Sequence, residues 1–237
     1  MSARTGTLLV AGVFTIAGCG GTEAAPAAGA GEGSVDSSST AISEVAESGV
    51  GTPVVLELVP ERSVARYRVR EQLVSLDLPN DAVGETSDVS GQIALDGEGG
   101  VVQEASSIRV GVAGLTSDRD RRDGYLRNRL LRADEYPTVE LRPTAMRGLP
   151  FPLPRSGTRT FEVVGDLTVL DVTRPTTWEV TATFDGDGAR GSAVTRFSFD
   201  DFQLTQPRVP VVLSVADTIA LEIDFAVTAM AGEAGSP

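Results

Sequence analysis

The sequence predicts an all-β domain over residues 52–230, built as a sandwich or an antiparallel barrel. Apolar residues alternate with Arg, Glu, Asp, Thr or Ser in about eight separate runs, which is typical of strands with one buried and one solvated face. Turn-forming residues such as Asp96 and Gly97, and the segment 185–188, separate the runs. Hydrophobic residues make up 41% of the 237 residues, so the chain has enough apolar side chains for a buried core.

Eight runs carry the alternation, and each has the length of a strand. The residues that we expect to face inward are, in chain order, Ala65, Tyr67 and Val69; Val89, Gly91, Ile93 and Leu95; Ile108, Val110 and Val112; Val139 and Leu141; Val163, Gly165, Leu167 and Val169; Trp178, Val180, Ala182 and Phe184; Phe197 and Phe199; and Ile219, Leu221, Ile223, Phe225 and Val227. Glu162 and Asp166 have the opposite parity and are expected to face solvent. Residues 75–88, 150–154 and 205–210 are expected to be loops.

One segment lacks the pattern of a strand. Residues 118–134 are highly charged, but Tyr125, Leu126, Leu130 and Leu131 recur at roughly helical spacing. We therefore expect a short helix or helical loop that closes one end of the domain.

The charged residues of this segment allow three interpretations. A calcium loop is disfavoured, because Arg122 stands at a ligand position and Arg129 replaces the glutamate of the twelfth position. A phosphate or lipid headgroup could pair with Arg119, Arg121 or Arg122, since guanidinium groups suit phosphate. We expect instead that the Arg and Asp side chains order the loop over the barrel mouth.

The N-terminal residues have the features of an export signal. A positive charge precedes an apolar run over 8–17, which is too short to span a bilayer, so residues 1–18 are expected to be a secretory signal peptide. The small residues before Cys19 resemble the bacterial lipobox, so Cys19 is the expected lipidation site. Residues 19–51 then form a lipidated flexible tether and 231–237 a disordered tail. The expected location is extracytoplasmic, as a membrane-anchored lipoprotein of the cell envelope or periplasm.

The composition excludes several classes of function. The chain has no histidine, no lysine and one cysteine, which removes histidine-dependent catalysis, Schiff-base chemistry and thiolate metal sites. A net charge of -13 makes nucleic acid an unfavourable partner. We therefore expect neither an enzyme nor a metal site, and no required cofactor.

The pattern of strands leaves the state of the barrel interior open. Small inward residues (Ala65, Gly91, Gly165 and Ala182) leave room among large ones such as Trp178. An eight-stranded barrel can be filled by its side chains or can hold one small ligand, and alternation looks the same in both cases.

Five further segments stand in an order that resembles the YceI-like family. They are residues 106–110 (SSIRV), 122–127 (RDGYLR), 136–141 (YPTVEL), 165–175 (GDLTVLDVTRP) and 199–202 (FDDF). The resemblance covers about 61 to 228 and implies a lipocalin-like, eight-stranded barrel that binds polyisoprenoids. Two segments depart from the family pattern: 66–73 lacks the histidine common in the first strand region, and Gln203 stands where glycine is usual.

The expected function is non-catalytic binding or carriage of a long isoprenoid lipid or quinone-like molecule inside the barrel. The alternative is a filled barrel that binds an envelope protein or polymer through its loops. The oligomeric state is left open. The residues that we expect to line the cavity are Tyr67, Val69, Ile93, Val110, Leu141, Leu167, Val169, Trp178, Val180, Phe184, Phe197, Ile223 and Phe225.

Overall fold

The computed structural model describes residues 51–232 of the chain. The expected signal peptide, Cys19 and all of the expected tether except Gly51 lie outside the described residues. None of the helices between 51 and 232 combines the length and the apolarity needed to cross a membrane.

Strands dominate this part of the chain, and all hydrogen-bonded neighbours among them are antiparallel. The strand segments are β1 (Val54–Leu58), β2 (Val64–Leu73), β3 (Asn80–Thr86), β4 (Val89–Leu95), β5 (Ser107–Gly111), β6 (Thr116–Ser117), β7 (Thr138–Arg147), β8 (Ser156–Val169), β9 (Val172–Asp185), β10 (Gly188–Ser198) and β11 (Val212–Ala231). The helical segments are η1 (Pro60–Arg62), η2 (Gln103–Ala105), α1 (Asp120–Tyr125), η3 (Leu126–Leu130) and η4 (Asp200–Phe202).

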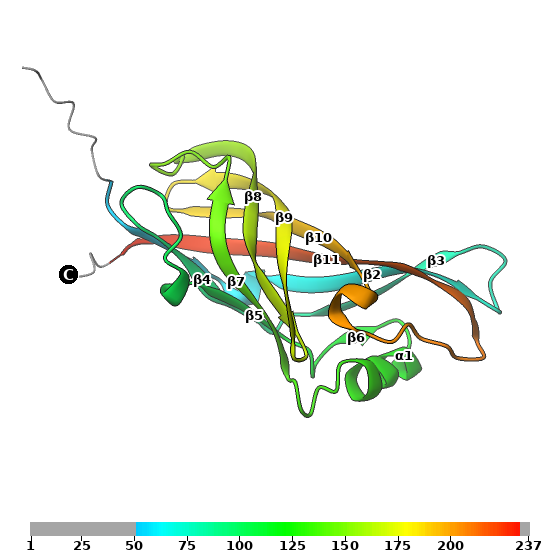
Figure 1. Cartoon of the computed structure of the whole chain (residues 1–237). Coiled ribbons are helices and arrows are strands. Elements are labelled where there is room, and N and C mark those ends of the chain that lie inside the picture. Colours follow the sequence, from blue (N-terminus) through cyan, green and yellow to red (C-terminus); the bar gives the residue numbers. More distant parts are fainter. Residues whose placement is uncertain (1–50, 233–237) are drawn as a thin grey trace, which may run out of the picture. The chain divides into compact units, whose positions relative to one another are not determined.

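These segments form a closed barrel of eight strands (Figure 1). Three of the eight barrel strands are each interrupted once and therefore carry two labels. These strands are β1 with β2, β3 with β4, and β5 with β6. The strands β7 to β11 are continuous, and each pairs with the next. The first part of β11 pairs with β2 and its end pairs with β1, which closes the ring. Of the two expected architectures, the barrel is therefore the one that forms.

A proline interrupts the strand formed by β1 and β2. Pro60 begins η1 and has no N–H group to donate to a strand ladder. The buried Ser63 bridges the gap, because its hydroxyl donates to the carbonyl oxygen of Val59 (2.9 Å) and accepts the N–H of Ala226 (3.4 Å). The buried Ala226 amide therefore keeps a partner where the ladder is broken.

The eight predicted runs all lie in strands, except that Val112 and Phe199 follow the ends of β5 and β10. Two boundaries need correction. Residues 80–86 form β3, although the whole segment 75–88 was expected to be a loop. β11 extends through Ala231, which we had assigned to the tail, and the N–H of Gly232 donates to the carbonyl oxygen of Pro53 (2.8 Å).

The predicted helical segment is confirmed and consists of α1 followed by η3. Its buried Asp123 accepts hydrogen bonds from the backbone N–H (3.0 Å) and the hydroxyl (2.6 Å) of Ser117. Asp123 therefore fixes the start of the helix to β6. Within residues 51–232 no group of acidic, cysteine or histidine side chains is arranged to hold a metal ion.

Two of the small inward glycines serve strand packing instead of leaving space. A Cβ atom at Gly91 would lie 2.0 Å from the carbonyl oxygen of Ser107, and one at Gly165 would lie 2.5 Å from that of Arg142. Neighbouring backbones approach these positions too closely for any side chain. The expectation that these glycines leave room in the interior is therefore wrong.

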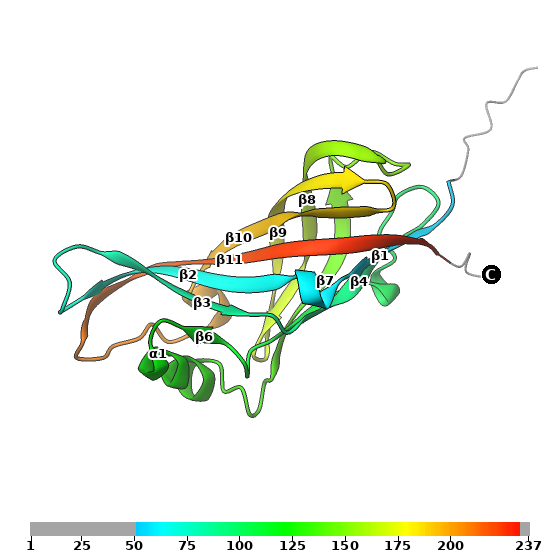
Figure 2. The ribbon, with the colours of Figure 1, turned by 180° about the vertical axis from the view of Figure 1, so that it is seen from behind.

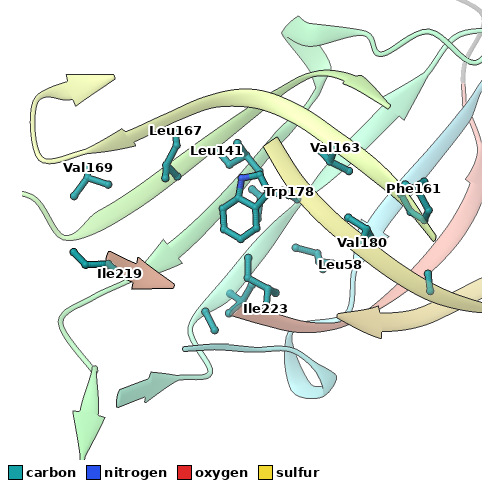
Figure 3. Close-up of a cluster of buried hydrophobic side chains, with 14 of the residues drawn as sticks. Leu58, Leu141, Phe161, Val163, Leu167, Val169, Trp178, Val180, Ile219 and Ile223 are labelled. Carbon is teal, nitrogen blue, oxygen red and sulfur yellow. The ribbon is translucent and has the colours of Figure 1, made fainter. Parts of the chain in front are cut away.

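Glu162 and Asp166 are exposed, as their parity predicts. The inward residues of β8 alternate with them and enter one core, which Figure 3 shows with Phe161 and Val163 toward one end of the barrel and Leu167 and Val169 toward the other.

We call the end that holds α1 and the β2–β3 turn the mouth, and the opposite end the closed end. Figure 2 shows both ends from behind.

Candidate functional site

A cavity of about 890 Å³ occupies the half of the barrel next to the mouth. This volume is in the upper part of the range of roughly 300–1,000 Å³ that is usual for small-molecule sites. Val69, Leu167, Val169 and Ile219 line its wall, and Leu130 of η3 covers one side. The lining is mostly aliphatic, so the cavity suits an apolar molecule.

Trp178 forms the floor of the large cavity. Its indole ring lies in the middle of the barrel between Leu141 and Ile223 (Figure 3), and only 3% of the residue is exposed. The indole N–H donates to the hydroxyl of Thr176 (3.1 Å), which satisfies the only polar group of the ring. The same ring also lines a second cavity of about 90 Å³ on its other side.

The closed end is filled by side chains. Phe161, Phe184 and Phe225 meet there with Leu58 and Met146, and they leave only the small second cavity. The interior is thus hollow on one side of Trp178 and packed on the other. Both alternatives that the strand pattern left open occur in one barrel.

A buried ion pair lies at the mouth. The guanidinium of Arg122 pairs with the carboxylate of Glu71, and the side chains are 13% and 8% exposed. Arg122 also pairs with Asp118 four residues before it. Burial lowers the pKa of Arg122, but Glu71 and Asp118 raise it more, so the net pKa is raised and the guanidinium stays charged. Arg122 therefore ties α1 to β2, as expected for a residue that orders this loop.

Tyr67 brings a polar group to the cavity wall. Its hydroxyl oxygen is buried and has no hydrogen-bond partner among residues 51–232. Burial raises the pKa of the phenol to about 12, because the charged form would lose its hydration. Gly84 on β3 makes room for the ring, since a Cβ there would lie 2.3 Å from it. A ligand with a carbonyl or hydroxyl group would give this phenol a partner.

The structure places nine of the thirteen predicted lining residues at the large cavity and the other four at the small one. Those at the large cavity are Tyr67, Val69, Val110, Leu141, Leu167, Val169, Trp178, Phe197 and Ile223. Those at the small cavity alone are Ile93, Val180, Phe184 and Phe225. Among the small inward residues, Ala65 lines the large cavity and Ala182 the small one. Contact of the predicted residues with a ligand stays a prediction.

Several lining residues do not belong to an alternating run. Val74 follows β2, Leu115 precedes β6, and Pro207, Val209 and Val211 lie in the connection to β11. Sequence periodicity could not find them, because they lie in turns and loops. The cluster of apolar residues over 207–215, unusual for a loop, was the available signal.

Comparisons with known proteins identify the same fold. A family model described as a YceI-like domain matches residues 56–227. No curated protein sequence matches the chain.

Three solved structures resemble the barrel at low sequence identity. A polyisoprenoid binding domain from Saccharophagus degradans, implicated in plant cell wall breakdown, is 11% identical with a TM-score of 0.57, covering 74% of this chain and 98% of that chain. BcnA from Burkholderia cenocepacia is 16% identical with a TM-score of 0.53, covering 72% and 99%. The YceI protein of Campylobacter jejuni is 16% identical with a TM-score of 0.50, covering 66% and 90%.

Proposed function

Since the chain belongs to the YceI-like family, we propose that its barrel binds one long isoprenoid lipid or quinone-like molecule by burial, without a covalent step. The observation that carries the proposal is the apolar cavity of about 890 Å³ above Trp178. The polyisoprenoid binding domain of Saccharophagus degradans, with the same fold, supports the choice of ligand class.

The size and lining of the cavity define the ligand further. A cavity of about 890 Å³ lies within the range of small-molecule sites and has room for one long apolar chain. Each buried methylene contributes about 0.8 kcal/mol, so chain length dominates the affinity. The Tyr67 hydroxyl offers one hydrogen bond to a quinone carbonyl or a prenyl alcohol.

We propose further that the protein is an extracytoplasmic lipoprotein anchored through Cys19. The lipobox-like residues before Cys19 and the Gly- and Ser-rich segment after it support this. The mass of the mature N-terminal peptide tests it. We expect a diacylglyceryl cysteine as the first residue, and an unmodified or uncleaved N-terminus would contradict the anchor.

The fluorescence of Trp178 provides a direct test of ligand binding, because it is the only tryptophan of the chain. A prenylated quinone that enters the cavity lies against the indole and quenches it. We expect saturable quenching with one ligand per barrel, and organic extraction of the purified protein to release a molecule of isoprenoid mass. If the purified protein is empty and takes up no prenyl lipid or quinone, the result would instead support the alternative, a module that binds partners through its loops.

A matched pair of variants locates the binding. Ala65→Phe puts a ring into the cavity and is expected to weaken quinone binding about tenfold or more, which is about 1.4 kcal/mol. Ala105→Phe adds the same ring at an exposed position of η2 and should leave binding unchanged. Equal affinities of the two variants would show that the ligand binds elsewhere.

A further inference from the structure

The mouth carries an exposed group of large aliphatic side chains. We call Val74, Leu76, Leu78, Val211 and Leu213 the apolar tip, and between 39% and 75% of each residue is exposed. Soluble proteins scatter such residues singly, and a contiguous group marks a surface that meets another apolar phase.

Two segments far apart in the sequence form the apolar tip. The turn after β2 supplies the first three residues, Val211 lies directly before β11, and Leu213 lies at the start of β11. The N–H of Val74 donates to the carbonyl oxygen of Val211 (3.1 Å), so the segments are joined. The register between β11 and β2 shifts between Val212 and Ser214, which makes Leu213 the extra residue of a bulge. The tip projects beyond the rest of the barrel in Figures 1 and 2.

The apolar tip is continuous with the large cavity. Val74 and Val211 belong to both, and Val209 and Val212 connect them. An apolar molecule that leaves the cavity along these side chains therefore meets the tip before it meets open solvent.

The helical segment at the mouth is more positive than the chain as a whole. Residues 118–132, which include α1 and η3, contain six Arg and three Asp and so carry a net charge of +3, while the chain carries -13. Arg119 and Arg121 lie at the cavity mouth with exposed side chains. Arg208 adds a positive charge in the loop before the tip. We call Arg119, Arg121 and Arg208 the basic rim, and such a rim beside an apolar tip is complementary to an anionic lipid surface.

We propose that the mouth docks on a lipid bilayer that contains anionic lipids, with the apolar tip among the acyl chains and the basic rim against the headgroups. The cavity then opens into the bilayer, and a lipid can exchange without crossing water. Lipid exchange through the docked mouth depends on the proposed function. Docking itself can be measured with an empty cavity.

Hydrogen exchange of the full chain with phosphatidylcholine–phosphatidylglycerol vesicles tests the proposal. We expect vesicles to slow exchange in 74–78 and 209–213, and to leave the closed-end segments 97–100 and 185–188 unchanged. Because the readout is local, binding through the N-terminal segment alone does not imitate it. Slowed exchange that spares the tip would overturn the proposal.

A pair of double variants supplies a matched control. Leu78→Ser with Leu213→Ser is expected to lower partitioning onto these vesicles at least tenfold. Val102→Ser with Met230→Ser changes two exposed aliphatic side chains away from the tip and should have no effect on it. All four positions are exposed, so both proteins should fold, which the urea midpoint checks. Equal partitioning of the two variants would contradict docking through the tip.

Two further measurements test the basic rim and separate docking from ligand binding. Arg119→Glu with Arg121→Glu should abolish the preference for anionic over pure phosphatidylcholine vesicles, and an unchanged preference would remove the basic rim from the proposal. Quenching of Trp178 by a prenylated quinone is measured on the same samples. Quenching without tip protection overturns docking alone, whereas tip protection without quenching overturns lipid binding alone.

Discussion

The mouth and the closed end of the barrel are built from the same strands but differ in what fills them. At the closed end, three phenylalanines from β8, β9 and β11 meet across the interior. At the mouth, β8 carries Leu167 and Val169 and β11 carries Ile219, and a large cavity lies between the walls. Side-chain size therefore decides whether an eight-stranded barrel is solid or hollow, and alternation alone does not.

The largest expected effect is on the free energy of unfolding, when one aromatic residue from each half of the barrel is changed to alanine. Phe161→Ala should lower the free energy of unfolding by about 3–5 kcal/mol, because the buried ring loses its apolar contacts and leaves a larger cavity among the packed side chains of the closed end. Phe197→Ala should lower it by about 1–3 kcal/mol, since this half-buried ring already faces the cavity on one side and contacts Phe202 on the other. Urea unfolding at pH 7 measures both.

Ligand binding should rank these two variants in the opposite order to stability. The closed-end variant should bind a prenylated quinone like the parent under conditions where it is folded, and Phe197→Ala should bind with altered affinity. Equal stability losses, or a binding defect confined to Phe161→Ala, would contradict the division of the barrel into two halves.

A smaller effect concerns the phenol at the mouth. The pKa of Tyr67 is raised to about 12 in the folded protein, while an unfolded tyrosine titrates near 10. The stabilisation that results is complete below pH 10 and is lost as the pH rises toward 12, because only the unfolded chain ionises in that window. Tyr67→Phe should leave stability near pH 8 almost unchanged and reduce its decline between pH 10 and 12.

Unfolding midpoints of parent and variant at pH 8 and pH 11 measure this difference. Parallel declines of the parent and Tyr67→Phe would show that the phenol at the mouth is not desolvated.

The smallest effect tests backbone strain near the mouth. Gln203 has a φ of 54°, in the left-handed region that favours glycine, and it ends η4 directly before the cavity residue Leu204. Gln203→Gly should raise the free energy of unfolding by about 0.5 kcal/mol, because relief of strain exceeds the added entropy of the unfolded chain. Gln203→Ala keeps a Cβ atom and should bring no gain in urea unfolding.

Most of the barrel could be predicted because its strands have strongly apolar inward faces. β3 could not, since its inward residues are Ala82, Gly84 and Thr86, which give almost no hydrophobic alternation. β1 is short, and Pro60 separates it from β2, so neither length nor pattern made it stand out.

The position of the cavity could be predicted only in part. Parity identified the inward residues correctly on β8 and β9, but parity does not report depth along the barrel axis. Val180 and Phe184 therefore entered the predicted set although they face the packed side of Trp178. The small size of Gly165 suggested space, whereas a neighbouring strand occupies that space. The loop residues of the mouth depend on tertiary contacts that no local pattern encodes.

Closure of the ring has a consequence for how the protein folds. Val54 pairs with Ala231, so the last ladder joins residues almost a whole domain apart in sequence. Folds dominated by such distant pairings form slowly, in milliseconds to seconds, because a large loop must close before its contacts stabilise it. The chain therefore cannot complete its barrel until its final strand is available. A truncation before β11 would leave two unpaired edges, on β10 and on the strand formed by β1 and β2, open to intermolecular pairing.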